Sequence, residues 1–240
     1  MKKYKKEYDY SYTLGIFPSI ELIHNKPDLV FKIVMSSKLD NEDIKEELIK
    51  FSENRNIELE INDSTISKLS EKENCYLIVF FNKEITELDK EKSHIVLVNP
   101  SNIGNIGNIV RTSLGFNFTN IAIITPSVDI MDPRSVRSSM GAVFSTNIEY
   151  FKSFEEYEQK YKEHIIYPFV LKGKNNLQTL NKKSKLCSLV FGTESSGLPD
   201  EFLKYENTVL IKHSNNIDSL NLTIAIGIAL YEFTKEYFDC

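Results

Sequence analysis

Three loops rich in asparagine, glycine and small polar residues carry the side chains whose types and spacing could do chemistry. The first follows the apolar run 94–98 and continues into a helical pattern that holds a single arginine, Arg111. The other two, Gly192 to Gly197 and Ile211 to Asn221, also follow apolar runs typical of buried strands. Open α/β sheets bind ligands at the carboxyl ends of their strands, and glycine lets the backbone approach a ligand closely. We therefore expect the three loops to converge on one small-molecule site.

The first loop admits a second interpretation, a dinucleotide-binding fingerprint. Gly104 and Gly107 follow a strand, and Asp129, after the next strand, could bind a ribose as the acidic residue of that fingerprint does. The complete G-x-G-x-x-G pattern is absent, however, and a glycine pair alone is explained equally well by a structural turn. A nicotinamide-dependent dehydrogenase therefore ranks below the functions considered next.

The elements that must position these loops alternate between strand and helix patterns, so the predicted fold class is α/β. Residues 1–90 are expected to form a small domain with the order βαβαβ, and residues 91–240 a second domain whose first strand begins at His94. A charged stretch, residues 82–93, is typical of a linker. We predict strands at 29–35, 57–61, 76–81, 94–98, 121–124, 165–171, 186–191 and 209–211. Helices are predicted at 41–54, from Asp63 or Ser64, through Arg111 to Gly115 or Asn117, at 134–140, at 154–161, from Pro199, and at 219–237, with a lysine-rich loop at 172–185.

The helical pattern at residues 219–237 is apolar nearly all round. A helix of this kind must be covered on more than one side. It is therefore expected either in the centre of the domain or at an interface between subunits.

Composition excludes several classes of protein. The net charge of −5 argues against bulk nucleic-acid binding, although lysines gather within residues 1–6 and 172–185, and three of the four arginines, Arg111, Arg134 and Arg137, lie close together. Lysine runs are most often solvated faces, whereas grouped guanidinium groups suit phosphates. The apolar runs are too short to span a membrane, and the lysine-rich start leads into acidic residues. We expect a soluble, cytoplasmic protein without a membrane association.

Cysteine and histidine residues give no sign of a disulfide framework or a metal site. The three cysteines and four histidines are dispersed along the chain, with no CxxC or HxxxH spacing. A structural role is the better interpretation for each of them.

The three loops resemble the signature motifs of the SpoU/TrmH family of RNA 2′-O-ribose methyltransferases, in the SPOUT superfamily. The family pattern N-x-G-x-x-x-R is matched by Asn105 to Arg111, the pattern G-x-E-x-x-G-hydrophobic by Gly192 to Leu198, and the pattern S-L-N-hydrophobic by Ser219 to Leu222. The resemblance covers residues 94–238 well and 10–90 more loosely. Two features depart from the pattern: an additional Asn-x-Gly copy at Asn102, and Lys212-His213 where the family has Pro-Met.

The resemblance implies a small N-terminal α/β substrate-binding domain followed by a trefoil-knotted α/β methyltransferase domain. It implies S-adenosylmethionine as the cofactor, RNA as the partner and a homodimer formed through the C-terminal helix region. The catalytic and substrate-holding residues implied are Asn105, Arg111, Glu194, Ser219 and Asn221, and the cofactor-binding residues are Gly192, Gly197, Ile211 and Leu220.

Physical chemistry constrains the roles of three of these residues. Arg111 is often treated in this family as a general base, but a guanidinium is always protonated and offers no acceptor. Binding a phosphate and stabilising an alkoxide as it forms is the role that better suits Arg111. Glu194 could instead be a capping carboxylate at a helix N-terminus, and Ser219 suits an N-cap of the last helix.

The leading hypothesis is therefore transfer of a methyl group from S-adenosylmethionine to a ribose 2′-hydroxyl of structured RNA. The separate N-terminal domain favours ribosomal RNA over transfer RNA. The alternative is a non-catalytic RNA-binding or ribosome-assembly factor that retains the fold, motivated by Lys212-His213 and by the acidic N-terminal domain.

Overall fold

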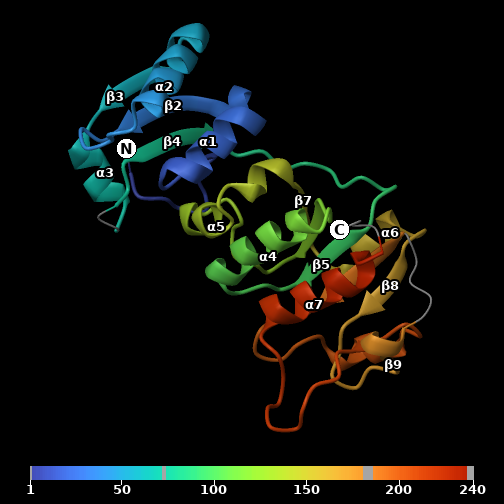
Figure 1. Ribbon diagram of the computed structural model, residues 1–240. Coiled ribbons are helices and arrows are strands. Elements are labelled where there is room, and N and C mark those ends of the chain that lie inside the picture. Colours follow the sequence, from blue (N-terminus) through green and yellow to red (C-terminus); the bar gives the residue numbers. More distant parts are fainter. Residues whose placement is uncertain (1, 72–73, 181–185, 237–240) are drawn as a thin grey trace. The chain divides into compact units, whose positions relative to one another are not determined.

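The computed structural model describes residues 2–71, 74–180 and 186–236 and divides into two compact units (Figure 1). The first unit comprises Met1–Glu84 and Asp129–Ser145, and the second comprises Ile85–Val128 and Thr146–Cys240. Part of the predicted lysine-rich loop, residues 181–185, and the end of the predicted last helix lie outside the described residues. Within the described ranges, no helix combines the length and apolar character needed to cross a membrane.

The first unit is built on a four-stranded sheet. Its strand order is β1-β4-β2-β3, with β2 and β3 parallel and the other neighbours antiparallel. The strands are β1 (Tyr10–Tyr12), β2 (Val30–Met35), β3 (Glu58–Ile61) and β4 (Leu77–Asn82). The helices are α1 (Ile16–Asn25), α2 (Glu42–Arg55), α3 (Asp63–Leu69) and α5 (Pro133–Ser138), with 3-10 turns η1 (Pro27–Leu29) and η2 (Ala142–Ser145).

The predicted βαβαβ order is present as β2-α2-β3-α3-β4, but the sequence does not predict β1 or α1. Strand β1 is three residues long, too short for an alternating pattern to be recognised. Helix α1 contains Pro18 in its first turn, where the missing N–H costs no helical hydrogen bond. Proline at this position therefore does not break the helix.

The segment Asp129–Ser145 belongs to the first unit although it follows strands of the second along the chain. Lys83 forms an ion pair with Asp129 at 3.0 Å, and the ring of Phe81 meets that of Phe144 edge to face at 5.1 Å. Both contacts join residues distant in sequence, which explains why the sequence pattern gives no sign of them.

The second unit is built on a parallel five-stranded sheet with the order β7-β6-β5-β10-β8. Its strands are β5 (His94–Val98), β6 (Asn120–Ile124), β7 (Asn147–Phe151), β8 (Ile165–Pro168) and β10 (Cys187–Phe191), and β9 (Asn175–Asn176) pairs separately with β11 (Val209–Leu210). The helices are α4 (Ile103–Gly115), α6 (Phe154–Lys160) and α7 (Leu222–Thr234), with 3-10 turns η3 (Leu177–Thr179) and η4 (Asp200–Lys204). The α/β class is confirmed; the trefoil knot implied by the resemblance stays a prediction.

The central strands of this sheet are buried on both faces, as expected for a parallel sheet. Every residue of β5, β6 and β10 is buried. On one face, Val96, Ala122 and Val190 pack in a cluster with Phe154 and Tyr157 of α6. Helices α4 and α7 lie side by side on the other face (Figure 1). The sheet therefore holds the loops at its strand ends on a rigid base.

Two helix predictions in this unit need correction. The last helix begins at Leu222 and not at Ser219, because Asn221 is its N-cap and accepts a hydrogen bond from the backbone N–H of Thr223 at 2.9 Å. The helix expected from Pro199 is only a 3-10 turn, η4. Strand β7 is not predicted, and the predicted lysine-rich loop contains β9 and η3.

Two buried histidines lie at the edge of the second unit's core. His94 is fully buried, with Nε2 2.9 Å from the carbonyl oxygen of Asp89 and Nδ1 2.9 Å from the hydroxyl of Tyr157. The Tyr157 hydroxyl lies 2.5 Å from Ser188 Oγ, which lies 3.0 Å from Nδ1 of His164. Burial lowers the pKa of His94 to about 4, against a smaller opposite effect of the hydrogen bond to Asp89. The ring is therefore neutral in the folded protein at neutral pH.

We expect the free energy of unfolding to fall by about 2 kcal/mol between pH 7 and pH 5 through His94 alone. In the unfolded chain His94 binds a proton once the pH falls below the ordinary histidine pKa, whereas in the folded chain it binds one only near pH 4. Acid therefore favours the unfolded state between these two values. Urea denaturation across this range should show a flatter profile for His94→Gln than for the wild type. Exposed His24 provides the control, and an unchanged profile for His94→Gln would contradict the prediction.

Candidate functional site

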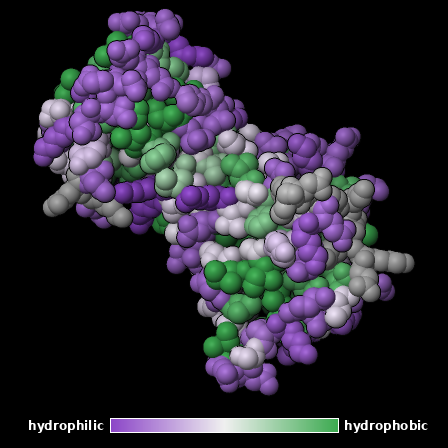
Figure 2. Space-filling model, viewed as in Figure 1, coloured by the Kyte–Doolittle hydropathy of each residue, from purple (hydrophilic) through white to green (hydrophobic). Residues whose placement is uncertain are grey.

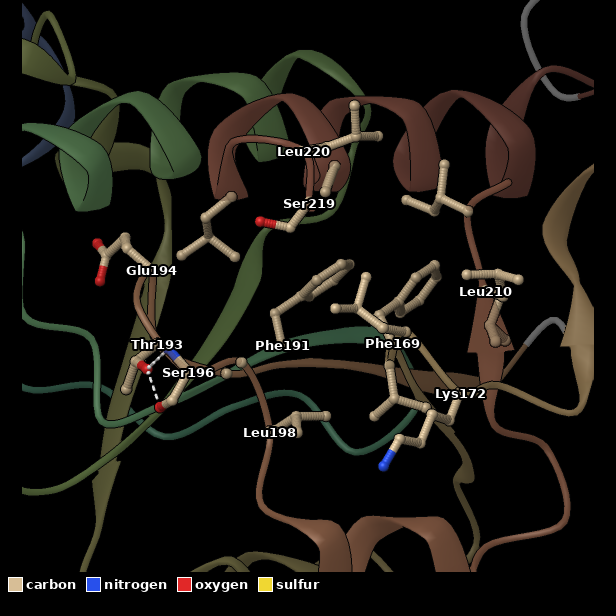
Figure 3. Close-up of a pocket in the computed structure, with 18 of the residues that line it drawn as sticks. Phe169, Lys172, Phe191, Thr193, Glu194, Ser196, Leu198, Leu210, Ser219 and Leu220 are labelled. Carbon is tan, nitrogen blue, oxygen red and sulfur yellow. Dashed lines mark hydrogen bonds between the residues drawn. The ribbon is translucent and has the colours of Figure 1, made fainter. Parts of the chain in front are cut away.

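A cavity of about 370 Å³ lies in the second unit, between the carboxyl ends of β8 and β10, the segment 209–213 and the residues that precede α7 (Figure 3). The sequence predictions place six of their residues in its lining. These are Gly192, Glu194, Gly197, Ile211, Ser219 and Leu220. The other three, Asn105, Arg111 and Asn221, lie outside the lining.

The loop after β10 is a tight turn that requires glycine. The backbone N–H of Thr193 donates to the carbonyl oxygen of Gly197 at 3.2 Å, and the N–H of Gly197 donates back to Thr193 at 3.1 Å. A Cβ atom on Gly192 would lie 2.0 Å from the carbonyl carbon of Gly197, where the backbone leaves no space. Gly197 itself has φ of +68°, a conformation that favours glycine. The turn therefore presents backbone groups directly to the cavity.

Glu194 links this turn to helix α4. One carboxylate oxygen accepts a hydrogen bond from Asn105 Nδ2 at 3.1 Å, and the other accepts from Ser101 Oγ at 3.0 Å. In Figure 3 the carboxylate points away from the rings of Phe169 and Phe191. Partial burial raises the pKa of Glu194, but the hydrogen bonds outweigh it and hold the pKa below its usual value. The carboxylate is therefore ionised and fixed in position at neutral pH.

The two Asn-x-Gly copies at the start of α4 have different structural roles. Asn102 is the N-cap, and its Oδ1 accepts a hydrogen bond from the backbone N–H of Asn105 at 3.0 Å. Asn105 lies one turn further on and contacts Glu194. The copy that matches the family pattern through Arg111 is therefore the one that contacts the cavity lining. Ser101, which precedes the cap, is a contact that the sequence analysis missed.

The segment Ile211 to His213 keeps a defined shape although it lacks the family's Pro-Met. The side chain of Gln178 donates to the carbonyl oxygen of Lys212 at 2.9 Å. His213 Nδ1 lies 2.8 Å from the carbonyl oxygen of Ile211, and the ring lines the cavity. Side-chain hydrogen bonds therefore hold the backbone where a proline would otherwise restrict it.

Two polar residues before and at the start of α7 differ in what they contact. Ser219 is exposed, lines the cavity and does not cap the helix. Asn221 Oδ1 accepts from both the backbone N–H and the hydroxyl of Thr223, at 2.9 and 2.6 Å. Asn221 therefore fixes the start of α7, and through it the direction of the segment that carries Ser219 and Leu220.

Arg111 stands apart from the cavity of its own chain. It is an exposed residue of α4, two turns beyond Asn105, and it is not in the cavity lining. The structure therefore brings together Glu194 and Asn105 but leaves the guanidinium of Arg111 on the surface.

An aromatic pair in the lining was also missed by the sequence analysis. The rings of Phe169, which follows β8, and Phe191, at the end of β10, are stacked with centroids 4.4 Å apart and planes at 15° (Figure 3). Phe191 is buried, whereas Phe169 is half-buried. Their position at the ends of adjacent strands is the signal that could have identified them.

This combination of groups favours a ligand with a flat apolar part and polar edges. The cavity has the size of a small-molecule site, an aromatic floor, and backbone N–H and C=O groups on the glycine turn. The charged side chains of the lining are Glu194, Asp200 and Asp218 against Lys172, an excess of negative charge that suits a ligand carrying positive charge.

Comparison with known proteins gives a consistent result. The sequence profile described as the SpoU rRNA Methylase family matches residues 92–231, more than half of the chain. A Listeria innocua protein described as a tRNA (cytidine(34)-2′-O)-methyltransferase is 30% identical over 149 residues, which cover 60% of this chain and 88% of that protein. A Streptomyces azureus 23S rRNA (adenosine(1067)-2′-O)-methyltransferase is 32% identical over 142 residues, covering 58% of this chain and 52% of the relative.

The fold is shared along nearly the whole chain with a solved structure. The crystal structure of an AdoMet-bound rRNA methyltransferase from Sinorhizobium meliloti aligns with a TM-score of 0.83, covering 96% of this chain and 89% of that one, at 22% identity. The similarity therefore includes the first unit as well as the second.

Proposed function

The chain belongs to the SpoU rRNA Methylase family, and from this premise we propose that it methylates a ribose 2′-hydroxyl of ribosomal RNA with S-adenosylmethionine as methyl donor. It is an S-adenosylmethionine-dependent RNA 2′-O-methyltransferase. The observation that carries the proposal is the cavity itself, in which residues of two family motifs form the lining and Glu194 connects it to the third.

The cavity lining fits S-adenosylmethionine. The stacked pair Phe169 and Phe191 provides a flat surface for an adenine ring. Gly192 and Gly197 lie in the lining, so ribose and amino-acid groups can contact their main-chain atoms. Ile211 and Leu220 add apolar contacts, and the excess of negative charge suits a sulfonium. We propose that Gly192, Gly197, Ile211 and Leu220 hold this cofactor.

Bound S-adenosylmethionine supplies a methyl group already activated on a positively charged sulfur. The protein must then hold the 2′-hydroxyl in line with that methyl carbon, and positioning of this kind can supply several kcal/mol of the barrier. We propose that Ser219, Asn221 and Asn105 position the RNA. A carboxylate has about four acceptor positions, and the two hydrogen bonds from Asn105 and Ser101 leave Glu194 able to accept one from the ribose.

We propose that Arg111, outside the cavity of its own chain, binds a phosphate of the RNA beside the target ribose, and that the 2′-hydroxyl proton passes to the Glu194 carboxylate as the oxygen bonds to the methyl carbon. Its exposure on α4 leaves the guanidinium accessible to a macromolecular substrate. A guanidinium donates in a fixed fork that matches phosphate geometry. This role needs no acceptor on the arginine, unlike that of a general base.

Ribosomal RNA is favoured over transfer RNA by the extent of the similarities. By sequence, the tRNA-directed and rRNA-directed relatives match nearly equal parts of this chain, 60% and 58%, whereas the structure of the rRNA methyltransferase also covers the first unit, 96% of the chain in all. A large folded RNA can engage a separate positioning unit in addition to the site of chemistry. We therefore propose that the first unit binds ribosomal RNA.

We propose a homodimer formed through α7. Ile224 and Tyr231 lie on the same side of this helix and are each 56% exposed, and Ile217 before the helix is 50% exposed. Apolar side chains gather at this place in the second unit in Figure 2. A second copy would cover them, which accounts for a helix that is apolar nearly all round.

Cofactor binding is tested with Phe169→Trp, because the chain contains no tryptophan and the variant has a single reporter. S-adenosylhomocysteine should change its emission, while Phe17→Trp, at an exposed position of the first unit, should not respond. Phe169→Ala should weaken binding in calorimetry about fivefold or more through lost stacking. Absence of any binding to the wild type would favour the non-catalytic alternative.

Substrate class and the role of Arg111 are tested by transfer of labelled methyl groups. Wild-type protein should methylate ribosomal RNA and not transfer RNA, and Arg111→Ala should lower the rate about 100-fold or more. Cofactor affinity should stay within about twofold, since Arg111 lies outside the cavity. Arg55→Ala, an exposed arginine of α2, is the control. Preferential methylation of transfer RNA would overturn the substrate assignment.

The dimer is tested by sedimentation. Wild-type protein should sediment at about twice the chain mass of 27.7 kDa, and Ile224→Glu should sediment at the chain mass because a charge cannot be buried unpaired. Ile61→Glu, at an isoleucine of β3 that is 66% exposed, is the matched control. A monomeric wild type, or a dimeric Ile224→Glu, would contradict the proposal.

A further inference from the structure

The first unit begins with an arm in which lysines and tyrosines alternate. The arm is defined here as residues 2–10, with the sequence KKYKKEYDY. Its four lysines are exposed, and its three tyrosines are half-buried. The proposed chemistry of the second unit uses none of these residues. Their positive charge also contrasts with the rest of the first unit, which is acidic over most of its length.

The backbone of the arm is anchored and does not extend as a loose tail. The hydroxyl of Tyr4 donates to the carboxylate of Asp129. Lys83 contributes three contacts: an ion pair with Asp129 at 3.0 Å, a hydrogen bond to the carbonyl oxygen of Lys6 at 2.9 Å, and a position 4.9 Å from the centre of the Tyr4 ring. The side chains of Lys83 and Asp129 are only 15% and 13% exposed, so their attraction is screened little by salt.

A turn after this anchor directs the remaining tyrosines into an aromatic stack. The backbone N–H of Tyr8 donates to the carbonyl oxygen of Lys5 at 3.1 Å. The ring of Tyr8 then stacks on that of Tyr10, with centroids 5.1 Å apart and planes at 11°, and Tyr10 meets Phe31 edge to face at 6.0 Å. Tyr10 and Phe31 pack on the core of the unit, whereas Tyr8 is the outer ring of the stack.

The arm carries both signs of charge, with four lysines against Glu7 and Asp9. Burial raises the pKa of Tyr10, and Asp9 is close enough to add to that effect. Lys5 is paired with Glu7 at 3.6 Å, with both side chains well exposed, which is worth little in water. Lys2, Lys3 and Lys6 are also exposed. An aromatic ring in an arm with several exposed lysines is a combination that binds single-stranded nucleic acid, since bases stack on aromatic rings and phosphates attract lysines.

We propose that the arm binds an unpaired segment of the substrate RNA, with a base stacked on Tyr8 and the neighbouring phosphates at Lys2, Lys3 and Lys6. The choice of RNA rests on the proposed function. Anchoring by Tyr4, Lys83 and Asp129 lowers the entropic cost of binding, because the arm is ordered before the RNA arrives.

The charge component is tested in the full-length chain with the triple variant Lys2→Gln, Lys3→Gln and Lys6→Gln. Filter binding to ribosomal RNA over a series of KCl concentrations should show affinity lowered about tenfold at low salt. The slope of log K against log [KCl] should fall by about 2, as expected for three contacts to a single strand. The matched control removes three exposed lysines elsewhere in the same unit, Lys38, Lys50 and Lys68, and should keep the wild-type slope.

The stacking component is tested separately at one position. Tyr8→Phe keeps a ring and should bind RNA as the wild type does, whereas Tyr8→Leu should bind about fivefold or more weakly. Both variants should bind S-adenosylhomocysteine with wild-type affinity, which shows that the second unit is intact. Equal slopes for the arm and control triple variants, or equal affinities for Tyr8→Leu and Tyr8→Phe, would overturn the proposal.

The outcomes separate this proposal from the proposed function. If the wild type methylates ribosomal RNA while the arm variants bind it unchanged, the arm proposal alone fails. If the arm variants lose RNA binding while the wild type transfers no methyl group, the arm proposal stands and the catalytic function fails.

Discussion

The candidate site depends on the paired hydrogen bonds that Glu194 accepts from Asn105 and Ser101. These bonds join the glycine turn after β10 to the first turn of α4, two segments about ninety residues apart in the chain. Hydrogen bonds to an ionised carboxylate are stronger than those between neutral groups. They also hold the pKa of Glu194 below its usual value against the effect of burial. The carboxylate therefore stays ionised, and as an ion it forms stronger hydrogen bonds with Asn105 and Ser101.

The remaining geometry of the cavity follows from backbone requirements on either side of these two hydrogen bonds. Gly192 has no space for a side chain, and Gly197 has a positive φ, so the turn can close only with glycine at both positions. On the opposite side, Asn221 caps α7 and Gln178 holds the backbone at Lys212. Main-chain constraints therefore shape the pocket, and few charged side chains are needed inside it.

The polar groups of this protein divide into two kinds that serve different purposes. In the core of the second unit, His94 and Tyr157 are buried, hydrogen-bonded and neutral, and burial raises the pKa of Tyr157 while it lowers that of His94. In contrast, Arg111 and the lysines of the arm are exposed. Neutral groups can be buried at modest cost once they are hydrogen-bonded, whereas charges that must meet a polyanion have to stay in water until it binds.

The sequence by itself determined the α/β class, most of the strands, and the family, because apolar periodicity and three motifs with fixed spacing are local properties of the chain. It also singled out Gly192, Glu194 and Ile211, which the structure places in the lining of the cavity. Only the tertiary structure decided that Ser101 contacts Glu194, that Phe169 and Phe191 stack in the cavity lining, and that Arg111 stands outside its own chain's cavity. These relations arise from contacts between segments far apart in sequence, which depend on strand order and helix packing and leave no periodic signal in any one segment.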